Sequence, residues 1–120
     1  MRKTLMINSF EEIELSGYIW QSTEDAHLKG IVILVHGMAE TIERYDEFAS
    51  YLSENHYIVY GINQRGHGPN AEMLGYLGDD GWQKMKEDLK SVLNYAKSFR
   101  SDLPAFIIAH SMGSFVARDF

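Results

Sequence analysis

The amino-acid sequence predicts an α/β protein whose sheet is mainly parallel. Short runs of β-type apolar residues alternate with longer segments that have the apolar spacing of an amphipathic helix. One run, residues 31–35 (IVILV), is apolar at every position, which is typical of a strand covered on both faces. A length of 120 residues fits a single domain, and 45% hydrophobic residues are enough for a packed core.

The first third of the chain is predicted to form strands. Two are expected at residues 5–10 (LMINSF) and 14–22 (ELSGYIWQS), and both precede the apolar run. A polar turn at residues 23–25 then leads into the third predicted strand, residues 29–37 (KGIVILVHG). The fold is therefore expected to begin with two extra strands before the strand that starts the first crossover.

A helix is predicted over residues 41–55. Apolar side chains recur at offsets of zero, three, four and seven, which places them on one helical face: Tyr45, Phe48, Ala49 and Leu52. Thr41 is the expected N-cap of this helix, and Asn55 is the residue at which it should end. Residues 57–64 (YIVYGINQ) follow as another strand of the buried type.

A second, longer helix is predicted before the last strand. Its apolar positions have helical spacing: Trp82, Met85, Leu89, Val92, Leu93, Ala96 and Phe99. Asp79 and Asp80 precede its first turn, and Lys97 and Arg100 lie in its last turn, as the helix dipole favours. Pro104 then ends the helical pattern and opens the strand at residues 105–109 (AFIIA).

Composition argues against several classes of function. The net charge is −6 and the chain has no basic run that could neutralise a phosphate backbone, so a nucleic-acid partner is not expected. There is no cysteine and no histidine pair with ligand spacing, so we expect no metal. The N-terminal residues are too briefly apolar for a secretory signal or an integral membrane segment, which predicts a cytoplasmic location.

The candidate nucleophile is Ser111, in the stretch AHSMGS directly after the last predicted strand. A serine hydroxyl is a weak nucleophile, so an enzyme must present it to a base and point backbone donors at the oxyanion. A sharp strand-to-helix turn does both, and it needs small residues two positions before and after the serine. Ala109 and Gly113 meet that requirement. The alternative is a serine that caps an ordinary helix.

A second candidate group, His36, Gly37 and Met38, directly follows the apolar strand 31–35. If this strand neighbours the last one, the C-terminal ends of both open on one crevice, where open α/β sheets bind ligands. The backbone N–H groups of Met38 and Met112 would then form an oxyanion hole. The alternative is an ordinary loop after a strand.

His67 lies in a tight glycine-rich turn, RGHG, after the strand 57–64. This strand also ends on the crevice side, so the histidine either lines the site or hydrogen-bonds the turn. Both interpretations remain open from the sequence.

Four stretches in order resemble a known family: HGMAE, RGHG, LGYLGDDGW and AHSMGS. Together they resemble the α/β-hydrolase superfamily, and within it the monoacylglycerol lipase or lysophospholipase-like serine hydrolases. The resemblance covers nearly the whole chain. It implies an incomplete α/β-hydrolase fold, in which residues 1–120 hold the first five strands and end in the helix after the nucleophile. The cap region and the C-terminal strands of the domain are then absent.

The resemblance also implies roles for individual residues. Ser111 matches the nucleophile, the amides of Met38 and Met112 match the oxyanion hole, and His36 and Gly37 match the HG of the oxyanion loop. Ala109 stands where the general motif has glycine. The triad of this fold runs Ser, Asp or Glu, then His, and after Ser111 the chain has only Asp119 and no histidine. We therefore expect the N-terminal part of a longer hydrolase, inactive alone.

The implied activity is hydrolysis of carboxylic esters without a cofactor, through an acyl-enzyme on Ser111. A small-molecule ester or lipid, such as an acylglycerol or a lysophospholipid, is the expected substrate. An amidase, peptidase or thioesterase on the same fold is an alternative, as is a non-catalytic binding protein. A nucleotide-binding domain is disfavoured because no G-x-G-x-x-G follows a strand. The sequence leaves the oligomeric state open.

Overall fold

The computed structural model describes residues 2–8, 14–22, 28–36, 41–63 and 81–109. Its elements follow the predicted order, with a short 3-10 helix, η2, before the first α-helix. They are β1 (Arg2–Asn8), β2 (Glu14–Trp20), β3 (Gly30–Val35), η2 (Ile42–Tyr45), α1 (Asp46–Glu54), β4 (Tyr57–Ile62), α2 (Gly81–Phe99) and β5 (Ala105–Ala109). The helix predicted to begin at Ser111 lies outside the described residues.

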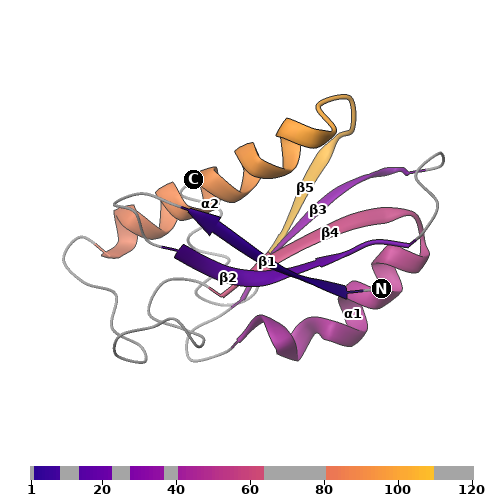
Figure 1. Cartoon of the computed structure of the whole chain (residues 1–120), viewed down its shortest axis with the longest axis horizontal. Helices are drawn as coiled ribbons and strands as arrows, with labels where there is room; N and C mark the ends of the chain where they lie inside the picture. The colour runs from indigo at the N-terminus through magenta and orange to yellow at the C-terminus, as the bar shows by residue number, and fades with distance from the viewer. Residues whose placement is uncertain (1, 9–13, 23–27, 37–40, 64–80, 110–120) are drawn as a thin grey trace.

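The strands form one sheet in the order β1-β2-β4-β3-β5. β1 and β2 are antiparallel to each other, and β2 is antiparallel to β4. β4, β3 and β5 run parallel, as the sequence predicts for the later strands. Figure 1 shows α1 and α2 on opposite sides of this sheet, so the protein has three layers.

The apolar run of β3 is covered on both faces, which confirms the prediction from its sequence. All its residues are buried, and alternate side chains enter two separate core clusters. Ile31, Ile33 and Val35 belong to the cluster that contains buried residues of α2. Val32 and Leu34 belong to the cluster on the α1 side. A period of two along the strand divides the core in this way.

The first helix differs in detail from its prediction. Phe48, expected on the buried face, is 42% exposed, whereas Ala49 is fully buried and Ser53 is 2% exposed. The segment begins as the 3-10 turn η2, which has about three residues per turn instead of 3.6. The spacing counted from Tyr45 nevertheless holds at offsets four and seven, since Tyr45, Ala49 and Leu52 all pack in the α1-side cluster. Phe48, at offset three, is the predicted position that the structure leaves exposed. Asn55 ends the helix as predicted.

The second helix has the predicted buried face at Leu89, Val92 and Ala96, but Phe99 at its end is 63% exposed. Phe99 packs edge-on against Tyr95 on the helix surface. Lys97 lies in the last turn as predicted, and its Nζ donates to the carbonyl oxygen of Leu103, in the loop before β5, at 2.6 Å. Arg100, also predicted in that turn, lies just after the end of the helix.

β5 occupies one edge of the described sheet, where it pairs with β3. Three successive apolar side chains of this strand are partly open to solvent: Phe106 (50%), Ile107 (36%) and Ile108 (40%). An edge strand with partly exposed apolar side chains is a surface that promotes association.

Candidate active site

The C-terminal ends of β4, β3 and β5 lie at the same edge of the sheet, because these strands are parallel neighbours (Figure 1). Leu34 of β3 is level with Gly61 of β4, and Val35 is level with Ala109 of β5. Crevices at this edge are the usual ligand sites of open α/β sheets. All three motif-bearing segments predicted from the sequence start here.

The register between β3 and β5 brings together the start of the two principal motifs. Val35 and Ala109 are paired, and each is the last residue of its strand. The next residues are His36 and His110, which open the HGM and HSMGS sequences. The condition for a shared crevice, that these two strands are neighbours, is therefore met. The stretch with the candidate nucleophile Ser111 follows β5 in the sequence, and the predicted oxyanion loop follows β3.

Most predicted site residues lie outside the described ranges. They are Ser111, Met112, Met38, Gly37 and His67. Their roles stay predictions.

His36 is described, and its side chain has no exposed surface. It lies in the first position after β3, at the edge where the site is predicted. The residues that follow it lie outside the described ranges, so its place among the site-lining residues also stays a prediction. What the structure adds is that the β3 end of this loop is anchored in the core.

Ala109 replaces the glycine of the general nucleophile motif, and the structure accommodates its methyl group. Ala109 is partly buried and packs against the core cluster on the α2 side of the sheet. A small apolar side chain thus fits at this position, two residues before Ser111. The larger Phe106 and Ile108 of the same strand point into more open surroundings.

Asn63 is a residue of this edge that the sequence interpretation missed, because it counted Asn63 as part of the strand 57–64. It is the first residue after β4 and is 3% exposed. Its Oδ1 accepts the backbone N–H of Ile42 at 2.8 Å. Thr41 has the extended backbone of an N-cap but makes no side-chain hydrogen bond to the turn. The predicted capping role of Thr41 is therefore wrong in this respect: the acceptor comes from Asn63.

A polar cluster joins η2 and α1 to the N-terminal hairpin. Oδ1 of Asp46 accepts the indole N–H of Trp20 at 2.9 Å and a guanidinium N–H of Arg2 at 3.1 Å. The Tyr18 hydroxyl donates to Glu43 at 2.9 Å, and the Arg2 guanidinium lies 4.2 Å from the centre of the Tyr18 ring. These contacts hold η2, which follows the predicted oxyanion loop, against β1 and β2.

Two pKa values in this cluster are shifted. The hydrogen bond to the Glu43 carboxylate, followed by partial burial, raises the pKa of Tyr18 above 10.0. Partial burial alone would raise the pKa of Glu43, but hydrogen bonds from its own backbone, Tyr18 and Thr41, together with the Arg2 charge, leave it below 4.5. The carboxylate is thus ionised and the phenol is neutral at neutral pH.

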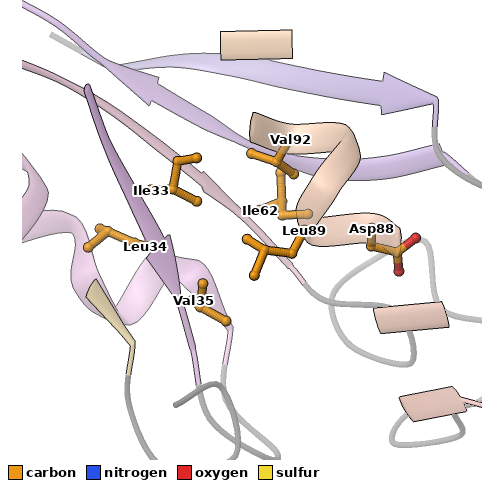
Figure 2. Close-up of a pocket in the computed structure, with 7 residues that line it drawn as sticks. All are labelled: Ile33, Leu34, Val35, Ile62, Asp88, Leu89 and Val92. Carbon is orange, nitrogen blue, oxygen red and sulfur yellow. The ribbon is translucent and has the colours of Figure 1, made fainter. Parts of the chain in front are cut away.

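A largely apolar pocket lies behind the site edge, between α2 and the ends of β3 and β4 (Figure 2). Its cavity volume is only about 10 Å³, which is room for about one water molecule. It is lined by Ile33, Leu34, Val35, Ile62, Asp88, Leu89 and Val92. Asp88 is 3% exposed and has an interaction partner, as a buried carboxylate requires. Among the described residues, no group of histidine, aspartate and glutamate side chains is arranged to hold a metal.

Comparison with known proteins adds a family and several relatives. The model of the family described as serine aminopeptidase, S33, matches residues 26–120. A monoacylglycerol lipase of Mycolicibacterium smegmatis is 32% identical over 95 residues, which are 79% of this chain and 32% of that protein. A monoglyceride lipase of Rattus norvegicus is 28% identical over 89 residues, 74% of this chain and 29% of that protein.

A solved structure agrees with the fold. The thermostable carboxyl esterase from Bacillus coagulans, in complex with glycerol, superposes with a TM-score of 0.88 and 30% identity. The match covers 98% of this chain and 39% of the esterase. The chain thus spans about a third of the length of the relatives it matches. No helix in the described part of the chain is long and apolar enough to cross a membrane.

Proposed function

Because the chain belongs to the serine aminopeptidase S33 family of α/β-hydrolases, we propose that it carries the nucleophile and oxyanion donors of a longer serine hydrolase of carboxylic esters. The observation that carries this proposal is the pairing of Val35 with Ala109. That pairing starts the HGM and HSMGS motifs at adjacent positions on one sheet edge. A nucleophile and its oxyanion donors have to be neighbours in this way.

The proposed reaction is an acyl transfer in two steps. The hydroxyl of Ser111 gives its proton to a histidine base and attacks the ester carbonyl, and the N–H groups of Met38 and Met112 stabilise the resulting oxyanion. Collapse of this intermediate releases the alcohol, which takes the proton from the histidine. Water, deprotonated by the same base, then cleaves the acyl-enzyme and releases the acid.

The base and its orienting acid are proposed to lie outside residues 1–120. No histidine follows Ser111 in the sequence, and the matched relatives are about three times as long as their aligned regions. Removal of the histidine of a serine triad lowers kcat by about a million-fold. Residues 1–120 alone are therefore expected to show no measurable hydrolysis of esters. The full-length protein is expected to hydrolyse them.

Acylglycerols are the proposed substrate class. Two relatives with about 30% identity are named as monoacylglycerol or monoglyceride lipases, and the superposed esterase was solved in complex with glycerol. Lysophospholipids present the same ester on a glycerol backbone, so they belong to the same assay panel.

Covalent labelling tests the nucleophile directly. A fluorophosphonate probe should label the full-length protein, and Ser111→Ala should abolish the label. Ser114→Ala is the matched control, since it removes another serine of the same stretch and should retain labelling. Labelling that persists in Ser111→Ala, or its absence in the wild type, contradicts the proposal.

Amide hydrolysis is the second candidate, because the description of the matched family names an aminopeptidase. The two activities are separated by comparing kcat/KM for a monoacylglycerol with that for an amino-acid p-nitroanilide. A higher value for the ester supports the proposed function. A higher value for the anilide assigns the chain to peptidase chemistry on the same nucleophile.

A further inference from the structure

The connection from β3 to η2 is anchored in the core at both ends. His36, directly after β3, and Ile42, the first residue of η2, have no exposed surface. The side chain of Ile42 lies close against the sheet because residue 61 is glycine: a Cβ there would be 2.6 Å from Cγ1 of Ile42. Met38, whose N–H we propose as an oxyanion donor, lies between these anchors in the sequence. The described residues on either side of the segment that contains Met38 are therefore both held in the core.

The anchor at Ile42 depends on a side chain from another strand end. The backbone N–H of Ile42 donates to Oδ1 of Asn63 at 2.8 Å, in a buried hydrogen bond between residues 21 positions apart. The first N–H groups of a helical turn have no acceptor within the turn. Thr41, in the N-cap position, supplies none from its side chain. Asn63 provides the missing acceptor and so fixes the start of η2.

Asn63 is itself held in one orientation. Its backbone N–H donates to the carbonyl oxygen of Ser16 at 2.8 Å, and Nδ2 donates to Oγ of Ser16 at 3.4 Å. A backbone N–H can only donate, so the side-chain atom that faces Ile42 must be the amide oxygen, and the NH₂ group must face Ser16. Through this side chain, the start of η2 is held in a fixed position relative to β2 and β4.

We propose that Asn63 is a positioning residue for the reaction at Ser111. By accepting the Ile42 N–H it fixes the end of the connection from β3, and thereby the position of the Met38 N–H. The inference rests on the proposed function. An oxyanion donor acts on charge that develops in the transition state, so its displacement lowers kcat more than substrate binding. A misplacement of about 1 Å is sufficient for a loss of about 100-fold.

Three substitutions in the full-length protein test the role of Asn63. Asn63→Leu removes both polar atoms at similar volume, and Asn63→Ser keeps a hydroxyl that is too short to reach Ile42. Asn63→Asp keeps an oxygen for the Ile42 N–H, while its other oxygen can accept from the Ser16 hydroxyl. At temperatures well below each Tm, we expect Asn63→Leu and Asn63→Ser to lower kcat by roughly 10- to 100-fold with KM nearly unchanged. Asn63→Asp should retain most of the wild-type kcat.

Ser16→Ala is the matched control. It removes only the 3.4 Å side-chain contact with Asn63 and leaves the backbone acceptor and the Ile42 hydrogen bond in place. We expect it to retain the wild-type kcat. A fall in kcat as large as that of Asn63→Ser, with the Ile42 N–H still hydrogen-bonded by its amide NMR shift, would show that the effect does not pass through Ile42 and would overturn the inference.

Inhibition by an alkyl boronic acid distinguishes positioning from a purely structural role. Boronic acids form a tetrahedral adduct with the serine that places an oxygen where the oxyanion forms. In Asn63→Leu and Asn63→Ser, the inhibition constant should rise by the same factor by which kcat falls. A purely structural role lowers Tm and leaves kcat and the inhibition constant at wild-type values. That result in Asn63→Ser overturns the inference, even if Asn63→Leu fails to fold.

Labelling with the fluorophosphonate probe separates failure of this inference from failure of the proposed function. If the wild type is neither labelled at Ser111 nor active, the proposed function fails and this inference fails with it. If the wild type is labelled and active but Asn63→Ser keeps its kcat, the inference alone fails.

Discussion

One oxygen atom of Asp46 serves two donors of different kinds. It accepts the indole N–H of Trp20 at 2.9 Å and the Arg2 guanidinium at 3.1 Å. Trp20 is fully buried, whereas the side chains of Arg2 and Asp46 are 41% and 47% exposed. Exposed ion pairs contribute little to stability, but a buried donor that loses its acceptor is costly. The Trp20 hydrogen bond is therefore the more important of the two.

Substitutions at Asp46 should separate these contributions. Asp46→Ala removes the acceptor of Trp20 and should lower the free energy of unfolding by about 1–2 kcal/mol. Asp46→Asn keeps an acceptor oxygen and loses only the charge, so it should cost less than about 1 kcal/mol. Urea denaturation of the full-length protein measures both values. Equal losses in the two variants would mean that the Arg2 ion pair, not the Trp20 hydrogen bond, stabilises this contact.

Replacing His56 by glycine should stabilise the protein. His56 has a φ of 74°, a conformation that costs about 1–2 kcal/mol for a residue with a Cβ. Its Nδ1 is also a buried atom without a hydrogen-bond partner in the described part of the chain. Allowing for the greater freedom of glycine in the unfolded state, the net gain should be about 0.5–1 kcal/mol. His56→Ala keeps the Cβ and should give no such gain, and a comparable rise in Tm for both variants would contradict this explanation.

The interaction between Tyr18 and Glu43 predicts a dependence of stability on acidic pH. Since the folded-state pKa of Glu43 is below 4.5, its ionised form stabilises the fold above about pH 4.5. That contribution is lost as the pH falls through the lowered pKa. Tyr18→Phe removes one hydrogen bond to the carboxylate and should raise the pKa of Glu43, as measured by NMR titration. An unchanged pKa in this variant would show that the Tyr18 hydroxyl does not stabilise the carboxylate.

Residues 1–120, expressed alone, should self-associate through β5. Phe106, Ile107 and Ile108 are 36–50% exposed on an edge strand, which is a surface that promotes association. Ile107→Lys should shift the molecule toward the monomer in light scattering. Tyr51→Lys is the control, because Tyr51 is 61% exposed on α1, away from this edge, and its replacement should have no effect. Equal effects of both substitutions would indicate a general gain from charge instead of association through β5.

Local sequence pattern predicted the elements whose structure depends on local burial. Every position of residues 31–35 is apolar, and a strand between two helical layers needs no other information. β1 was predicted to start at residue 5 but starts at Arg2, since its length is determined by the pairing of Arg2 with Trp20. The local sequence of β1 does not show which residue of another strand Arg2 will pair with, so the start of the strand could not be predicted from it.

In the candidate site, too, local sequence motifs could be predicted, whereas contacts between distant residues could not. The HGM and HSMGS motifs were found from their sequence, and their adjacency followed once the strands were taken as neighbours. Asn63 was missed because its role is a contact with Ile42, 21 residues away, that local pattern cannot show. The exposure of Phe48 was missed because helical spacing alone does not show how far the apolar stripe is turned toward the sheet: the buried positions of α1 are Ala49 and Ser53.

The order of the strands has a consequence for the space above β3. From β3 the chain passes through α1 to β4 on one side, and it returns through α2 to β5 on the other side. The two helices cover opposite faces, so the connections diverge at β3 (Figure 1). β3 is thus a topological switch point, the kind of position at which open α/β sheets bind their ligands. We propose that the ester substrate approaches the end of β3 between these two diverging connections.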